Sequence, residues 1–468
     1  MTGLRLLALT LAIALAACRA GPDYAPPPAP ASKALISGAF LRGGDAVSTP
    51  APARWWEGLG DAQLDALVAK GLAQAPGLAA AEARLRQARA GLAATRSGLL
   101  PSGGASLLYA HADLPDGAIG GASSGSNIDL FNAGFDAQWE ADIWGGKRRD
   151  IERADAEAEA AQARLADAQV ALSAEIARSY VALRARQARL ALLGERHAIE
   201  AKLDTIARQR LAGGTAPRQA VEAATAQVER SEAEQAGVAA EIAVLGDALA
   251  VLTGQAPGEL GELSAGTIPL PPASVAIGDP ATLLARRPDI RAAERQLAAA
   301  SAKIGMEKAK RFPSVSFMGL IGIGGASAGD IFDASKLSTI ALPRLSWNFL
   351  DFGRGAAAVR GAEAGRDAAL GDYRAQVLSA LQDAESALAR YGAARVALAR
   401  SASGADHAGE IARLQRLRGR AGTVPPSEAL EAQRQAIDAR LAETAARADL
   451  TQAYVALAKA LGLGWQNA

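Results

Sequence analysis

The sequence predicts a mainly α-helical protein in which long antiparallel helical hairpins are joined to four strands of a membrane β-barrel. Three observations lead to this fold class. The segment from Trp139 to Gly145 recurs from Trp347 to Gly353, 208 positions later, which indicates an internal duplication. Each copy closes an alternating, strand-like run and opens a proline-free stretch of about 65 residues with helical character. Such helices far exceed the three or four turns usual in globular proteins, so we expect an elongated device rather than an enzyme fold.

The composition favours long helices packed through small side chains. Aromatic residues make up 4% of the 468 residues, and alanine dominates the hydrophobic half. The 50 basic and 49 acidic residues leave a formal charge of +1, so no general attraction to nucleic acid is expected. The single cysteine, Cys18, excludes a disulfide framework and a cysteine-ligated zinc site.

The N-terminus reads as an export signal. Arg5 precedes an apolar run, residues 6–17, that is too short to span a bilayer and ends in small residues. The sequence Leu-Ala-Ala-Cys at 15–18 resembles a bacterial lipobox, which implies a lipoprotein signal peptide at 1–17 and acylation of Cys18. Arg19 follows where an inner-membrane retention signal usually has aspartate, so the same resemblance implies the outer membrane. The alternative is an ordinary signal peptide with an incidental cysteine. Beyond residue 18 no run of 18 or more apolar residues occurs, so no transmembrane helix is expected.

The mature chain is expected to begin with a tether and a broken helix. Residues 18–56 are rich in proline, alanine and serine, which predicts an extended N-terminal segment. The first repeat is expected at 57–259. Its first helix follows Asp61, an N-cap candidate, and runs toward Leu99, with Pro76 and Gly77 as the place for a break or kink.

Strands are expected at about 102–112 and 131–143 in the first repeat and at about 314–323 and 337–350 in the second. In 131–143, apolar residues such as Phe135 and Trp139 alternate with polar ones such as Asp136 and Glu140. If the apolar side meets lipid, Asp136, Glu140 and, in the second repeat, Arg344 are candidates for facing a lumen. The alternative is a half-buried sheet of a soluble protein, but no amphipathic element of matching size is left to cover it.

Four strands cannot close a barrel. An open sheet edge is not tolerated within lipid, so several chains must share one barrel.

Long helices are expected at about 147–211, 217–253, 354–420 and 426–463. Their alanine-rich seams step by three and four residues, as in coiled coils, and about 65 residues make a helix of about 100 Å. Glycine ends and proline starts the helices at the turns 213–217 and 421–425. A linker at 260–279 separates the second repeat, 280–464. A soluble antiparallel coiled coil explains these helices but leaves the strands and the lipobox unexplained.

The strand-to-helix corners have an architectural interpretation. Gly145 and Gly353 permit a sharp turn, and Asp142 and Asp351 lie just ahead of the positive helix end. No cofactor is expected, because the segment 141–148 lacks the first glycine and the final serine or threonine of a phosphate loop.

No catalytic or metal site is expected either, because the three histidines are scattered and none has a partner at a suitable spacing. They are His111, His197 and His407.

Taken in order along the chain, these features resemble the outer membrane factor family, the TolC and OprM group, and especially its lipoprotein branch that includes NodT. The landmarks are the start of the mature chain at 18–24, Trp55 and Trp56 before Asp61 and Leu64, the two corners, and the paired Gly-Thr-x-Pro tips. The resemblance covers essentially the whole mature chain. It implies a homotrimer with a twelve-stranded outer-membrane β-barrel and a periplasmic α-barrel of helical hairpins.

The resemblance also implies a function, the exit duct of a tripartite efflux system. The expected partners are a periplasmic adaptor protein, an inner-membrane pump reached through that adaptor, and outer-membrane lipid, without nucleic acid. The alternatives are an exit duct for type I protein secretion and a structural lipoprotein that tethers the envelope. The sequence names no transported substrate.

The hairpin tips are candidates for a gate or an adaptor-docking surface: Gly214, Thr215, Arg416, Arg418, Arg420, Gly422 and Thr423. In the family, inward acidic side chains commonly narrow the second tip. Here residues 413–427 contain four arginines and no acid. The arginines either line the gate, paired with acids such as Glu410, Glu428 or Glu222 to offset their repulsion, or face outward toward solvent and the adaptor.

Overall fold

The structure is a computed structural model that describes residues 20–28, 33–43, 49, 52–114, 126–261, 263–264 and 266–465. Cys18 and the signal peptide lie outside the described residues. The chain divides into two compact units. Unit 1 comprises Met1–Pro28, Arg84–Ala161 and Ala292–Tyr373, and unit 2 comprises Ala29–Ala83, Gln162–Arg291 and Arg374–Ala468.

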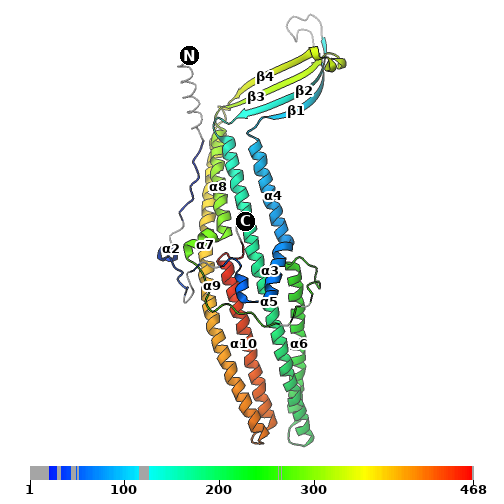
Figure 1. The fold of residues 1–468 in the computed structure, drawn as a ribbon, viewed down its shortest axis with the longest axis vertical. Helices are drawn as coiled ribbons and strands as arrows, with labels where there is room; N and C mark the ends of the chain where they lie inside the picture. Colours follow the sequence, from blue (N-terminus) through cyan, green and yellow to red (C-terminus); the bar gives the residue numbers. More distant parts are fainter. Residues whose placement is uncertain are drawn as a thin grey trace. The chain divides into compact units, whose positions relative to one another are not determined.

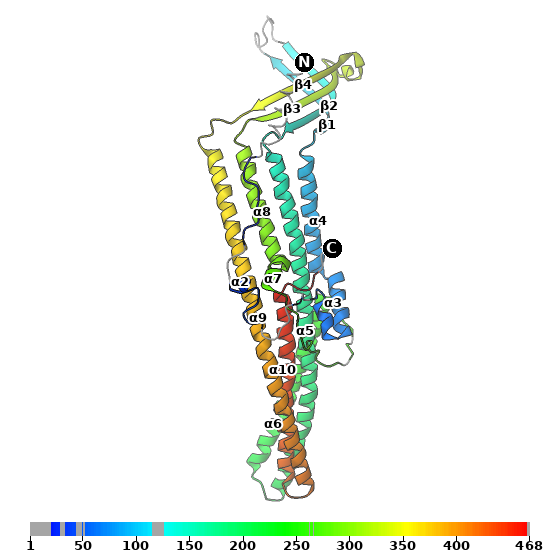
Figure 2. The ribbon, with the colours of Figure 1, turned by 60° about the vertical axis from the view of Figure 1, so that its left-hand side comes forward.

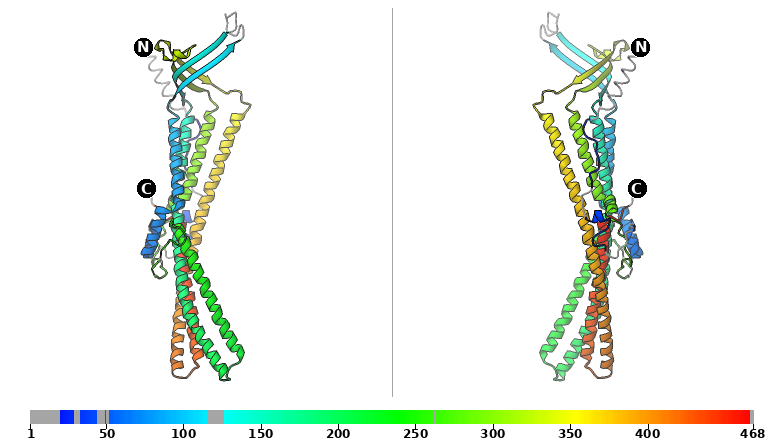
Figure 3. Two further views of the ribbon diagram at one scale, coloured as in Figure 1. Left: turned by 90° about the vertical axis from the view of Figure 1, so that its right-hand side faces the viewer. Right: turned by 90° about the vertical axis from the view of Figure 1, so that its left-hand side faces the viewer.

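The duplication is visible in matched element lengths. Helices α4 (Pro76–Ser97) and α8 (Pro288–Ala309) have 22 residues each. Helices α5 (Gly146–Ala212) and α9 (Arg354–Arg420) have 67 each, and α6 (Arg218–Leu252) and α10 (Pro426–Ala460) have 35 each. In Figures 2 and 3, α5 with α6 and α10 with the end of α9 form two antiparallel hairpins. Shorter helices complete the described chain: α2 (Lys33–Ser37), η1 (Trp55–Leu59), α3 (Ala62–Gln74), α7 (Pro280–Arg286), η2 (Ala328–Phe332) and η3 (Ala334–Lys336).

A four-stranded antiparallel sheet in unit 1 joins the two repeats (Figure 1). Its order along the sheet is β1 (Ser102–Leu114), β2 (Ser126–Ala141), β3 (Ser314–Gly325) and β4 (Leu337–Ser346). Strands β1 and β4 therefore have one neighbour each, and their outer edges have no partner within the described chain.

Several expected boundaries need correction. The strand expected at 131–143 begins earlier, at Ser126, and ends at Ala141, because Asp142 turns away to accept hydrogen bonds from the next helix. The strand expected at 337–350 ends at Ser346, since the Trp347 indole instead donates to the carbonyl of Arg311 at 3.1 Å. The helix expected at 426–463 ends at Ala460 because Gly462 adopts φ +67°, where only glycine is unstrained. The other strand and helix ends differ from expectation by two residues or fewer.

The helix expected after Asp61 is two helices. The Asp61 side chain accepts hydrogen bonds from the amides of Gln63 and Leu64 and caps α3. Ala75 is extended, with ψ 126°, because it precedes Pro76, and this residue separates α3 from α4.

The end of the expected tether belongs to the core of unit 2. Trp55 and Trp56 are buried, and Trp55 lies edge-on to Tyr454 of α10 with 5.8 Å between ring centroids. Helix α3 packs beside α5, where the Tyr180 hydroxyl donates to Asp61 at 2.7 Å. Burial, followed by this hydrogen bond, raises the pKa of Tyr180 to about 12.

Helix α6 bears on the expectation that no transmembrane helix follows residue 18. It is the one helix of the described chain that is long and apolar enough by length and composition, and 17% of the apolar window is buried. Alanine and valine raise its mean hydropathy without a continuous apolar run. Its Glu241 forms an ion pair with Arg186 of α5 at 2.5 Å, so α6 is tied into a helical hairpin.

Candidate functional site

One face of the sheet is apolar and uncovered. The strand register places the odd-numbered residues of all four strands on this face, which we call the apolar face. Its members include Leu107, Tyr109, Phe131, Phe135, Trp139, Phe317, Ile321, Ile323, Leu337 and Leu345. Leu107 is 76% exposed and Phe135 67% exposed, so no described residue covers this part of the face. A contiguous apolar surface of this kind marks an interface with lipid or protein.

Aromatic pairs border the apolar face at two levels. Tyr109 stacks on Phe131 with 4.7 Å between centroids, and Trp139 stacks on Phe317 at 5.7 Å. Eight residues of β2 separate the two levels, about 26 Å along the strand. Membrane barrels show an apolar band about 25 Å tall between two aromatic girdles. Because such strands tilt by about 35–45°, the two levels lie about 20 Å apart across the membrane, which is most of the height of that band.

Polar groups follow beyond the Tyr109 level. Nδ1 of His111 lies 2.8 Å from Asp129, on the same face, and the Tyr109 hydroxyl donates to that carboxylate at 3.1 Å. Local spacing could not predict a partner for His111, because Asp129 lies on the neighbouring strand, 18 positions away. The apolar band ends at this cluster.

The other face carries the three lumen candidates, and we call it the polar face. Glu140 lies opposite Ser316, which lies opposite Arg344, so one row of the sheet holds an acid and a base. Asp136 lies two rows away on the same face, between Gly104 and Leu320. Glu140 also approaches Lys147 at 3.8 Å. The structure thus places Asp136, Glu140 and Arg344 together on the face opposite Phe135 and Trp139.

At both corners an aspartate caps the long helix. Asp142 accepts hydrogen bonds from the amides of Lys147 and Arg148 at 2.9 and 3.0 Å, and Gly145 turns the chain with φ +75°. These are the free amides of the first turn of α5, and a carboxylate is favourable at this helix end.

The second corner repeats the device with a shift of one residue. Asp351 accepts from the amides of Gly353 and Gly355 at 2.9 and 2.7 Å, and Gly353 has φ +87°. The hydrogen bonds from Gly355 and Gly353 lower the pKa of Asp351. Phe352, at φ +49°, is the one non-glycine residue of the described chain with a positive φ, and it is 91% exposed.

In each repeat, one tryptophan ties the strand pair to the end of the preceding helix. The Trp139 indole donates to the carbonyl of Leu99 at 2.8 Å, two residues after α4 ends. The Trp347 indole donates to Arg311, two residues after α8 ends. Sequence reasoning used these tryptophans as repeat markers and as apolar strand residues, and it missed their hydrogen bonds to the helix ends.

Both hairpin tips use the same turn. Gly214 has φ +67°, and the amide and hydroxyl of Thr215 donate to the carbonyl of Arg210 at 2.8 and 3.0 Å. In the second tip, Gly422 has φ +73°, and Thr423 makes the same two bonds to Arg418, both at 3.0 Å. This is the Schellman ending, in which glycine takes the left-handed position.

The tip arginines are exposed and have no acidic partner. Within the described chain, Arg416, Arg418 and Arg420 form no ion pair. The acids considered as partners are engaged elsewhere: Glu410 binds Arg413 at 2.7 Å, Glu222 binds Arg218 at 3.1 Å, and Glu428 accepts from Gln415 at 3.4 Å. Within one protomer, the tip arginines therefore do not pair with these acids, each of which contacts a residue of its own hairpin.

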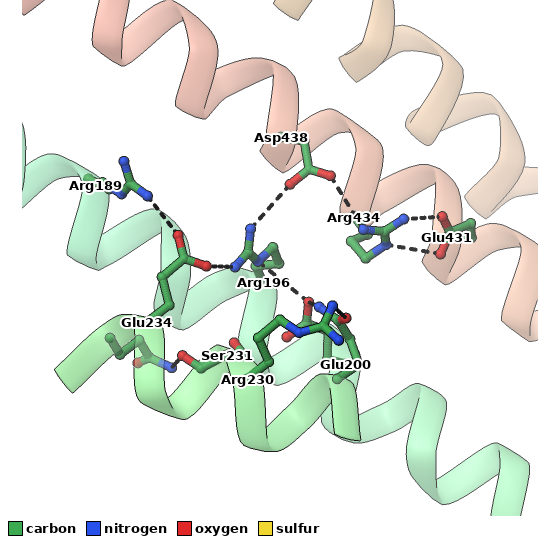
Figure 4. A network of polar contacts seen from close by, with 11 residues as sticks. Arg189, Arg196, Glu200, Arg230, Ser231, Glu234, Glu431, Arg434 and Asp438 are labelled. Atoms are coloured by element: carbon green, nitrogen blue, oxygen red, sulfur yellow. Dashed lines mark hydrogen bonds and ion pairs between the residues drawn. The ribbon is translucent and has the colours of Figure 1, made fainter. Parts of the chain in front are cut away.

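A polar network joins the first hairpin to the second (Figure 4). Arg196 of α5 lies among Glu234 of α6, Glu200 of α5 at 3.4 Å and Asp438 of α10 at 3.6 Å. Glu200 is buried. Burial opposes ionisation of Glu234, but hydrogen bonds from Arg189 and Arg196 outweigh it and lower the pKa. Sequence reasoning missed this network, whose one local signal is the spacing of Arg196 and Glu200 by four residues in an alanine-rich helix.

A buried arginine joins three helices in unit 2. The Arg287 side chain donates to the carbonyl of Ala460, at the end of α10, at 2.8 Å, and forms ion pairs with Asp289 at 2.6 Å and Asp383 at 3.4 Å. Gln376 of α9 also donates to Asp289 at 2.6 Å. Burial raises the pKa of Asp289, whereas the hydrogen bond and the charge of Arg287 lower it. The lowering effects outweigh burial, so the pKa lies below its usual value. We call Arg287 and Asp289 the helix clamp.

A profile of the family described as outer membrane efflux protein matches residues 67–255 and 280–463, which lie in the two repeats. The chain belongs to this family. It is 28% identical over 471 residues to the outer membrane protein OprJ of Pseudomonas aeruginosa, covering 98% of this chain and 96% of OprJ. It is 29% identical over 378 residues to nodulation protein T of Rhizobium leguminosarum bv. trifolii, covering 80% of this chain and 79% of that protein. The structure of the outer-membrane channel OprN shares 32% identity and a TM-score of 0.86, covering 96% of this chain and 99% of OprN.

The expected resemblance, fold class, function and location are thereby confirmed. This outer membrane efflux protein is a channel of the Gram-negative outer membrane that serves tripartite efflux and extends into the periplasm. Its relatives include outer-membrane efflux proteins and the outer-membrane channel OprN.

Proposed function

We propose that this chain is the passive exit duct of a tripartite efflux pump, conducting small organic molecules and catalysing no reaction. The observation that carries the proposal is the sheet of four strands with one uncovered apolar face and two unpaired edges. Edges without partners are not tolerated in lipid, so the sheet is a segment of a larger barrel. A barrel shared by three chains encloses an aqueous path.

Purified trimers inserted into a planar bilayer should produce discrete conductance steps. A protein that only tethers the envelope would produce none, and that result would end the proposal. An adaptor gene next to a proton-driven pump supports small-molecule efflux, whereas an adjacent ATP-driven exporter supports the alternative, type I protein secretion.

The trimer proposal also accounts for uncovered apolar residues on the helices. Val244 and Val251 of α6, and Val396 and Leu414 of α9, are exposed in the protomer. A neighbouring chain that closes the barrel would cover such residues, which otherwise cost free energy in water. Mass measurement of the detergent-solubilised protein is expected to give a trimer. A stable monomer with full strand content would refute the shared barrel.

The lipid anchor is proposed at Cys18. Since Cys18 is the one thiol of the sequence and ends the lipobox, Cys18→Ser is expected to block acylation and signal-peptide removal. Metabolic labelling with palmitate, together with the electrophoretic mobility of the protein, measures both effects. Normally processed, lipid-labelled variant in outer-membrane fractions would show that Cys18 is not the acylation site.

The polar face is proposed to line the lumen. Cysteine at position 136 or 140 is then expected to react with a membrane-impermeant thiol reagent, and cysteine at 135 or 139 is not, because successive side chains of a strand point to opposite faces. The unsubstituted protein corrects for labelling of Cys18. Labelling at 135 and 139 alone would mean that the two faces are assigned the wrong way round.

A further inference from the structure

The polar face contains an apolar patch on β3 and β4. Met318 lies opposite Leu342, and two residues along the strands Leu320 lies opposite Ile340. Met318, Leu342 and Ile340 are each about half exposed, with Met318 at 53%. We call these four residues the lumenal patch.

The patch has clear borders. The row on one side holds Glu140, Ser316 and Arg344, and the row on the other side holds Gly134, Gly322 and Ser338. The apolar surface is therefore two rows long and two strands wide, about 7 Å by 5 Å between side-chain origins. That area fits one aromatic ring or a short branched chain.

Apolar side chains are unusual at this position. The interior of a membrane barrel is polar where it holds water, and half-exposed leucine, isoleucine and methionine gain free energy when an apolar body covers them. Leu130 of β2 also lies on the polar face, but the strand register places it three rows beyond Asp136.

An unpaired carboxylate adjoins the patch. Asp136 lies directly opposite Leu320, at the separation of about 5 Å typical of facing side chains. Its other neighbour in the row is Gly104, which has no side chain to cover it. Asp136 forms no ion pair within the described chain, whereas Glu140 has Lys147 at 3.8 Å and shares its row with Arg344.

We infer that the lumenal patch and Asp136 form a subsite for amphiphilic organic cations, which the barrel repeats in each protomer. The apolar body of such a solute covers Leu320 and Ile340, and its positive charge lies beside Asp136. This inference rests on the proposed function, because it requires that the polar face line the conducting path.

The test uses purified wild-type trimers and three probes. Tetraphenylphosphonium combines an apolar body with a positive charge, tetramethylammonium has the charge alone, and tetraphenylborate has the body with a negative charge. Equilibrium binding to solubilised trimers and block of single-channel current are measured. Tetraphenylphosphonium is expected to bind at least about tenfold more tightly than tetramethylammonium, the difference expected from burial of one apolar side chain, and more tightly than tetraphenylborate.

Two variants separate the contributions of body and charge. Leu320→Asn with Ile340→Asn is expected to weaken tetraphenylphosphonium binding about tenfold, and Asp136→Asn about threefold without weakening tetraphenylborate. Leu130→Asn, on the polar face of the interior strand β2 and outside the patch, is the matched control and should leave binding unchanged. If the asparagine pair does not assemble, alanine at both positions replaces it.

The outcomes distinguish the two proposals. Conducting trimers that bind all three probes equally, or that lose binding to the same extent in the Leu130→Asn control, overturn the subsite alone. Trimers that never conduct overturn the proposed duct. Wild-type trimers that bind tetraphenylphosphonium while the patch and Asp136 variants bind it as tightly also overturn the subsite, because the cation then binds elsewhere.

Discussion

Replacing Arg416 and Arg420 together by glutamate is expected to move the reversal potential in a potassium chloride gradient toward that of potassium, and to change the resting conductance. Both side chains are exposed near the end of α9, and neither forms an ion pair within the described protomer. A trimer repeats them three times around the tip, where a narrow path concentrates their potential. Reversing the sign of that ring should therefore reverse the preferred ion.

Arg447→Glu is the matched control for this experiment. Arg447 lies on α10 and pairs with Glu443 at 2.6 Å, so its substitution changes the charge of the same hairpin away from the tip. The control should leave the reversal potential unchanged. If the tip variant also leaves it and the conductance unchanged while trimers stay intact, the arginines belong to the outer surface. Loss of crosslinking to the adaptor is then the effect to measure.

Substituting Arg287 by methionine is expected to lower the free energy of unfolding by about 3–5 kcal/mol, the range measured when one partner of a buried ion pair is removed. The methionine cannot donate to Ala460 or compensate Asp289, which remains largely buried. Thermal and denaturant unfolding of the purified trimers measures the change. Asp383→Asn is the graded control, since its distance of 3.4 Å from Arg287 and its exposed side chain predict a loss below about 1 kcal/mol.

On acidification, the free energy of unfolding should change in opposite directions in the wild type and in Arg287→Met. The pKa of Asp289 is lowered in the folded protein, so the ion pair stabilises the fold above the unfolded pKa of about 4, and that stability is lost as the pH falls through the lower, folded value. In Arg287→Met, Asp289 stays buried but loses Arg287, the main group that lowers its pKa. The pKa of Asp289 in the folded variant therefore rises. The variant should therefore gain stability relative to wild type as the pH falls from 7 to 5. Parallel profiles for both proteins would contradict the role of the helix clamp.

Local patterns predicted most of the secondary structure, because proline, glycine and alternating hydrophobicity act within a few residues. Helix α9 was predicted to the residue, since Gly353 and Gly422 turn the chain at its two ends. Alternation also predicted that Glu140 and Arg344 share one face, whereas the row that they share follows only from the strand pairing. Helix α8 was not predicted, although Pro288 provides a start signal, because its seam is mixed with charged residues.

The contacts that join distant segments could not be predicted. Arg287 reaches a carbonyl 173 positions away, and Arg196 reaches Asp438 on another hairpin. The residues near Arg287 and Arg196 in the sequence do not indicate which distant segment each side chain contacts. The lumenal patch was missed for a related reason, since Met318 and Leu342 become neighbours only through the pairing of β3 with β4.

The open edges of β1 and β4 have a consequence for how cells produce this protein. A newly exported chain has two unsatisfied strand edges and an uncovered apolar face, so it is prone to aggregate until three copies meet. Correct assembly then competes with aggregation for the same pool of unassembled chains. Periplasmic chaperones that keep these chains soluble should therefore raise the yield of channels obtained at a given rate of synthesis.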